Sequence, residues 1–127
     1  MCFFGPVKEV REVPADKPLT GYRVLERRSN RKLYSWAFGT STPWRKNKPR
    51  RSNRKPRRYG DMHGLHVFRR LGDCRKWARE NAFFDSKPVL VKVRFWGTVV
   101  EHYTGPDPDK YAGYRAHYMQ IVEVLKG

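Results

Sequence analysis

One stretch of polycationic sequence limits where this chain can build a hydrophobic core. Residues 45–58 read RKNKPRRSNRKPRR, which is nine Lys or Arg residues and no acid in fourteen positions. Charged side chains are almost never fully buried without partners, so this segment cannot supply core residues. We therefore expect residues 39–62 to form a long basic insertion loop that is disordered on its own, with the core built from the sequence on either side.

The positive charge of the chain is concentrated in one window. Residues 23–58 hold fourteen of the 28 Lys and Arg residues, with Glu26 as the only acid in that window. The remaining sequence holds 28 − 14 = 14 basic and 12 − 1 = 11 acidic residues, so it is close to neutral. A nearly neutral domain that carries one cationic segment indicates an anionic partner rather than a particular reaction.

The size and cysteine content favour a single domain in a reducing compartment. A chain of 127 residues can bury one core without disulfides or metals. Its two cysteines, Cys2 and Cys74, are far apart and neither belongs to a CxxC motif, so we expect no disulfide framework and no cysteine-based zinc site. No apolar run is long enough for a membrane span and no secretory signal is recognisable, which favours the cytoplasm.

The hydrophobic pattern predicts an α+β fold: a mostly antiparallel sheet of five or six strands with one helix and a long basic loop. We expect an extended N-terminal arm over residues 1–19 and a single domain over 20–127. The helix is predicted to begin at Gly72-Asp73, and helical spacing places Leu71, Cys74, Trp77, Ala78 and Asn81 on one face. The strands are predicted at residues 21–26 and 32–38 (a hairpin), 64–68, 88–95, 99–103 and 114–125, with a bulge at Gly97.

In the last predicted strand, one side is expected to carry Tyr114, Ala116, Tyr118, Gln120, Val122 and Val124.

The basic loop and the turn of the predicted hairpin are the candidate nucleic-acid-binding surface. They share the hexapeptide RRSNRK, at 27–32 and 50–55, which we interpret as a coincidence of composition or a duplicated basic patch. Lys and Arg side chains bind phosphates with release of counterions, and aromatic side chains can stack on unpaired bases. Trp36 is a further candidate for stacking. The candidate residues are Arg27, Arg28, Arg31, Lys32, Trp44, Arg45, Lys46, Lys48, Arg50, Arg51, Arg54, Lys55, Arg57, Arg58 and Tyr59.

Evidence for catalytic or metal chemistry is weaker. His63 and His66 are three residues apart in an extended stretch, where their side chains point to opposite faces, and only His102 and Glu101 are attractive as further ligands. Glu101 is the one carboxylate among apolar neighbours, and it could act as a general base or pair with Arg115, the alternative we favour. We expect no metal, no cofactor and no catalytic residues.

Several segments resemble a family of small bacterial and bacteriophage domains that has no established activity. The matching motifs are Gly64-Leu65-His66-Val67-Phe68, the Trp96–His102 stretch WGTVVEH and Gly113-Tyr114-Arg115-Ala116. The resemblance covers residues 64–118 well and residues 21–38 loosely. It implies a bacterial or phage source and a location in the bacterial host cytoplasm, and it makes residues 45–58 an insertion into an ordinary loop.

A second likeness is to ADP-ribosyltransferase folds. Residue by residue it assigns Arg23, the Thr40-Ser41-Thr42 stretch and Glu101 to the family's Arg, Ser-Thr-Ser and Glu elements. In that family these elements bind NAD, support the site and act on the ribose. Here the spacing from Arg23 to Ser41 is short, and residue 103 is Tyr where a second Glu would stand.

The prediction from the sequence is a non-enzymatic phage or bacterial protein that binds RNA or DNA through an Arg-rich loop. A narrower form is an inhibitor of a host defence ribonucleoprotein, similar to an anti-CRISPR protein. An ADP-ribosyltransferase-like enzyme that uses Arg23, Ser41 and Glu101 and a binder of an acidic protein surface are the alternatives. We expect no membrane partner.

Overall fold

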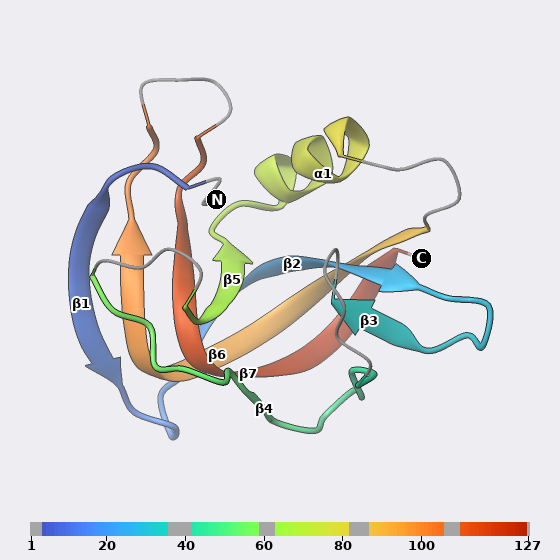
Figure 1. The fold of residues 1–127 in the computed structure, drawn as a ribbon, viewed down its shortest axis with the longest axis horizontal. Helices are drawn as coiled ribbons and strands as arrows, with labels where there is room; N and C mark the ends of the chain where they lie inside the picture. The colour runs from blue at the N-terminus through green and yellow to red at the C-terminus, as the bar shows by residue number, and fades with distance from the viewer. Residues whose placement is uncertain (1–3, 36–41, 59–62, 82–86, 106–109, 127) are drawn as a thin grey trace.

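Seven strands and one helix form the described part of the chain, which covers residues 4–35, 42–58, 63–81, 87–105 and 110–126 of a computed structural model (Figure 1). All pairings between these strands are antiparallel, so the predicted α+β class and the mostly antiparallel sheet are confirmed. The elements are β1 (Val7–Val13), β2 (Leu19–Arg27), β3 (Leu33–Ser35), β4 (Arg50–Arg51), β5 (Leu65–Phe68), α1 (Leu71–Glu80), β6 (Pro88–His102) and β7 (Gly113–Lys126).

The strand pairings close on themselves into a small barrel. β6 pairs with β2, β2 with β5, β5 with β7, and β7 returns to β6. The contact between β2 and β5 is a single residue pair, Tyr22 with Phe68, so the ring is narrow at that point. Strands β1, β3 and β4 are added outside the ring, on β6, β2 and β7 respectively.

The main core lies inside this curved sheet. The predicted stripe of Val89, Val91, Val93 and Phe95 along β6 is fully buried there, which confirms it. β6 runs on without a break to His102, and its register against β7 shifts between Trp96 and Val99. Gly97 sits at this shift with a positive φ of 84°, which confirms the predicted bulge.

The predicted one-sided stripe of β7 is wrong beyond Ala116. Tyr114 and Ala116 do face the core, but the next core residues are Met119 and Ile121, and Val122 and Val124 are exposed. The bulge explains the change, because three steps along β6 (Trp96 to Val99) match only two along β7 (Tyr118 to Ala116). The extra residue changes which side chains of β7 point inward.

Helix α1 covers a second, smaller core on the other side of β2. Cys74 and Ala78 are buried against Val24, Phe68 and Leu90, and Leu71 and Trp77 pack at the margin, as the spacing predicted. The predicted start is wrong: the helix begins at Leu71 after an N-cap at Arg70, whose side chain makes no capping bond. It ends at Glu80, with Asn81 as the C-cap.

The expected N-terminal arm contains a strand. β1 pairs with the second half of β6, and its flanking prolines, Pro6 and Pro14, stand outside the paired residues. Phe4 anchors the start of this segment, because it is buried against Phe68 and His102. Within the described ranges, no helix is long and apolar enough to cross a membrane.

Candidate nucleic-acid interface

Residues 42–58 form a basic strap that is docked along one side of the barrel, opposite α1 (Figure 1). The Trp44 amide donates to the carbonyl of Leu33 at 2.7 Å, and the Asn47 amide donates to that of Ile121 at 3.2 Å. Arg50 and Arg51 then pair with Met119 and Tyr118 as β4. The segment that we expect to be disordered on its own is ordered here by docking, because the strap completes the backbone hydrogen bonding of exposed strand edges.

Three buried side chains hold the strap in place, and none of them is charged. Trp44 and Ser52 are 5% and 6% exposed, and Pro56 is fully buried. Gly64 has a φ of 96° and lies so close to Pro56 that an added Cβ would approach Pro56 Cβ to 2.9 Å. Arg115, itself buried in the sheet, donates to the carbonyl of Arg57 at 2.7 Å. Two of these buried side chains, Ser52 and Pro56, lie within the cationic run itself, and Trp44 directly precedes it.

Trp44 is packed between two arginines. Arg23 from β2 and Arg50 from the strap lie 5.1 and 4.6 Å from its ring, and its Nε1 donates to Ser35 Oγ at 2.8 Å. Both guanidinium groups are attracted by the ring quadrupole, although they repel each other. This packing contradicts the expectation that Trp44 stacks on bases, because the ring is buried; Trp36 and Tyr59 lie outside the described residues.

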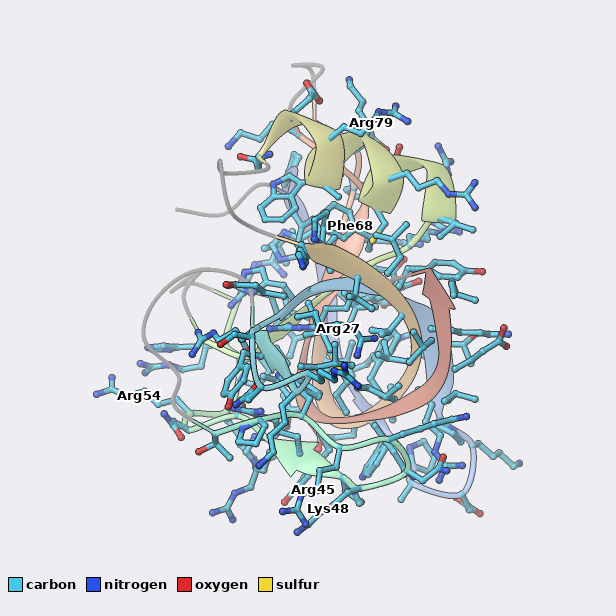
Figure 2. The ribbon with its side chains drawn as sticks, turned by 90° about the vertical axis from the view of Figure 1, so that its right-hand side faces the viewer. Arg27, Arg45, Lys48, Arg54, Phe68 and Arg79 are labelled. Carbon is cyan, nitrogen blue, oxygen red and sulfur yellow. The ribbon has the colours of Figure 1, made fainter. Side chains whose placement is uncertain are left out.

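Eleven of the thirteen Lys and Arg side chains of the strap and of the hairpin tip (residues 27–32) are exposed, and Arg27 and Arg50 are half-buried. Arg45 and Lys48 project from one end of the molecule in Figure 2, Arg54 projects sideways, and Arg79 of α1 lies at the opposite end. Among the thirteen Lys and Arg residues of strap and tip, the described part of the chain supplies one ion pair, Arg28 with Glu26 at 3.8 Å. The other twelve cations have no carboxylate partner there, so this side of the protein is strongly positive.

The hairpin tip is confirmed as a tight turn between β2 and β3. Arg31 adopts a positive φ of 66°, and Asn30 Oδ1 accepts a hydrogen bond from the Lys32 amide at 3.0 Å. Arg28 stacks on Tyr34 at 4.0 Å. An isolated antiparallel β-bridge between Leu33 and Trp44 connects the start of the strap to β3. It brings the strap and the hairpin tip, the two parts of the predicted site, to the same edge of the sheet.

A cavity between the strap, β2, β3 and the start of β5 was not predicted from the sequence. It has a volume of about 390 Å³, and its lining includes Arg23, Ser35, Arg50, Arg51, Ser52 and Arg54. Burial, and secondarily the charge of Arg50, lowers the pKa of Arg23 to about 10, so the group stays protonated at neutral pH. The sequence does contain a signal for the inward position of Arg23. Residues alternate between the two faces of β2, and Arg23 therefore lies on the same face as the buried Gly21 and Leu25.

The histidines are dispersed, and no cluster of three or more His, Cys, Asp or Glu that could hold a metal occurs among the residues described. His102 Nδ1 lies 2.8 Å from the Gly5 carbonyl, and its Nε2 accepts from Arg115. His117 Nδ1 lies 3.3 Å from Ser52 Oγ. Burial and the nearby charges of Lys55 and Arg51 lower the pKa of His117.

Glu101 is buried but does not pair with Arg115, so that expectation is wrong. It lies 3.3 Å from Arg11 and 3.6 Å from Lys8, both on β1. In the register of β6 and β7, Glu101 is opposite Tyr114 and Arg115 is opposite Val100, so the two side chains point to opposite faces. Glu101 does not line the cavity that contains Arg23, and Ser41 lies outside the described residues.

No protein-family model, curated protein or solved structure matches this chain. The resemblances to small phage domains and to ADP-ribosyltransferase folds stay predictions, and the functional argument rests on the surface itself.

Proposed function

We propose that this protein binds nucleic acid through the phosphate backbone, with the basic strap and the hairpin tip as the contact surface. The observation that carries the proposal is the anchored strap, which holds nine cations on a fixed backbone without a carboxylate partner among the described residues. A preorganised cationic surface loses less conformational entropy on binding than a disordered segment of the same composition.

The composition of the surface favours phosphates over other anions. Six of the nine strap cations are Arg, whose planar group can form two hydrogen bonds to one phosphate. Since Trp44 is buried, the contact surface consists mainly of charged and polar side chains. We therefore expect binding with a steep salt dependence and little preference for sequence.

Two charge-matched variants test the proposal. One replaces Arg45, Lys48, Arg54 and Lys55 of the strap by Gln; the other replaces Arg69, Arg70, Arg75 and Arg79, exposed residues in and beside α1, by Gln. Fluorescence anisotropy with single- and double-stranded RNA and DNA over a range of salt gives the affinity and the slope of log K against log[salt]. For duplex DNA, four lost phosphate contacts reduce the slope by up to about 3.6.

The comparison of the two variants decides the result. The strap variant is expected to lose most of the affinity and the slope, whereas the α1 variant stays close to wild type. Equal effects of both variants would mean that net charge alone attracts the ligand. Weak binding of every nucleic acid by the wild type would favour an acidic protein partner, whose complex with this chain would survive nuclease treatment.

The narrower prediction, inhibition of a host defence ribonucleoprotein in the bacterial cytoplasm, has its own test. A pull-down from host lysate should recover a ribonucleoprotein through the strap, and the strap variant should lose it. Recovery of neither nucleic acid nor ribonucleoprotein would contradict this form of the proposal.

A further inference from the structure

The cavity behind the strap differs from the rest of the basic surface because arginines from separate elements meet in one hollow. Among the residues that the structure describes, four arginines and two serines line it, and no acidic residue does. The arginines come from two separate elements: Arg23 from β2, and Arg50, Arg51 and Arg54 from the strap. The strap therefore closes a cationic site that neither element forms alone.

Arg23 carries a charge that its described surroundings do not neutralise. Its Nη1 donates to the carbonyl of His66 at 2.9 Å, and its Nη2 lies 3.5 Å from Ser35 Oγ. Its Nε is buried without a hydrogen-bond partner, as is Nδ1 of His63, which also lines the cavity. A partly buried cation is costly unless an anion accompanies it, and the described residues that line the cavity supply none.

The polar groups around Arg23 have donor capacity left. Ser35 Oγ accepts from Trp44 Nε1 and from Arg23, which leaves its own hydroxyl proton to donate. Arg50 uses Nη1 for the carbonyl of Thr42 at 3.0 Å and keeps its other donors. Guanidinium and hydroxyl donors that converge without an acceptor are suited to a phosphate.

The volume and charge of the cavity narrow the ligand class. About 390 Å³ is far more than one phosphate needs and lies at the low end of the range of about 300–1,000 Å³ for small-molecule sites. A phosphomonoester carries a charge of about −1.5 to −2 at pH 7, which matches the two guanidinium groups on Trp44 better than the single charge of a backbone phosphodiester.

We propose that this cavity binds the phosphomonoester of a nucleotide, either at the end of a nucleic-acid strand or in a free mononucleotide, with all four lining arginines, Arg23, Arg50, Arg51 and Arg54, as its counter-charges. The strand-end form rests on the proposed function; the mononucleotide form does not. The strap cations outside the cavity then bind the phosphates that follow along a strand.

The test compares oligonucleotides that differ only at their ends. Strands with a 5′-phosphate, a 3′-phosphate or hydroxyls at both ends are titrated at one salt concentration, and a hydroxyl-ended strand one nucleotide longer controls for charge. In parallel, calorimetry measures binding of nucleoside monophosphates and of the unphosphorylated nucleosides. We expect one phosphorylated end to bind about tenfold more tightly or better, as one or two charge-assisted hydrogen bonds provide.

Matched variants locate the effect. Arg51→Ser with Arg54→Ser removes two exposed cations that line the cavity, and Lys46→Ser with Arg58→Ser removes two exposed strap cations that do not. Only the first pair should abolish the preference for a phosphorylated end. Arg23→Gln should abolish it too, with thermal unfolding as the check that this variant folds.

Each outcome separates this inference from the proposed function. Equal, salt-dependent binding of phosphorylated and hydroxyl ends, without mononucleotide binding, overturns the cavity assignment and leaves the proposed function standing. Mononucleotide binding that requires Arg51 and Arg54, without binding of any strand, overturns the proposed function and supports the cavity. A preference that both variant pairs keep also overturns the assignment.

Discussion

Trp44 shows how a single residue can decide the structure of a polar segment. Its ring makes cation–π contacts with Arg23 of β2 and with Arg50 of the strap, and its indole N–H donates a hydrogen bond to Ser35 Oγ. A tryptophan beside a basic run is typical of a base-stacking surface, but burial gives this one a structural role. Its contribution should therefore appear in stability first.

Replacement of Trp44 separates the two roles. Trp44→Ala should lower the free energy of unfolding by about 3–5 kcal/mol, as expected for a buried aromatic side chain. Trp44→Phe should cost about 1 kcal/mol for the lost hydrogen bond and keep most of the nucleic-acid affinity. Urea denaturation followed by circular dichroism measures both. An unchanged stability in Trp44→Ala, with loss of binding to single strands only, would show instead that the ring stacks on bases.

At the scale of elements, the shape of the barrel depends on the long β6–β7 pair. The register shift at Gly97 lets β6 bend, so that its first half pairs with β2 and its second half with β1. The same shift exchanges the faces of β7 and sets which of its residues enter the core. The bulge at this one glycine thus determines which side chains of β6 and β7 face the core and which face solvent.

Alanine at two glycines tests this. At Gly97 (φ of 84°) an added Cβ would lie 2.8 Å from Tyr118 Cδ2, so Gly97→Ala should destabilise the fold by about 1–3 kcal/mol. At Gly72 in α1 an added Cβ meets nothing within 4 Å, so Gly72→Ala should stabilise it by up to about 1 kcal/mol. Thermal unfolding of both variants gives the comparison. A neutral Gly97→Ala would mean that the bend does not require a left-handed residue.

At the scale of the whole molecule, the distribution of charge opposes folding and favours binding. The chain has a formal net charge of +16, and thirteen Lys and Arg residues lie in the strap and tip. Docking the strap brings these cations close together without carboxylates from the described residues around them. Their mutual repulsion should be reduced by salt, which should also weaken binding to polyanions.

The free protein should therefore become more stable as salt is added. Between about 0.01 M and about 0.15 M salt the Debye length falls from about 30 to about 8 Å. We expect the melting temperature of the wild type to rise by a few degrees over this range, on the order of 1 kcal/mol. The strap variant, which lacks four of the repelling charges, should show a smaller rise. A melting temperature that falls with salt would mean that attractive ion pairs dominate.

Local pattern determined much of the fold. Period-two alternation predicted the buried face of β6 and the hairpin of β2 and β3, and helical spacing predicted the buried face of α1. These features depend on neighbours in the sequence, which the pattern contains. The short strand β4 and the edge strand β1 were missed, because their pairing comes from distant open edges of the sheet.

The repeated hexapeptide RRSNRK shows where sequence stops and tertiary structure decides. At 27–32 it forms the exposed turn of a hairpin. The Asn30 side chain there donates to the Tyr34 hydroxyl and accepts from the Lys32 amide. At 50–55 the first two residues of the same hexapeptide form β4, and Ser52 is buried beside His117. The sequence by itself determined that both copies are cationic. Only the fold decided that one is docked on β7 and closes a cavity over Arg23, because the partners for that docking lie more than sixty residues away along the chain.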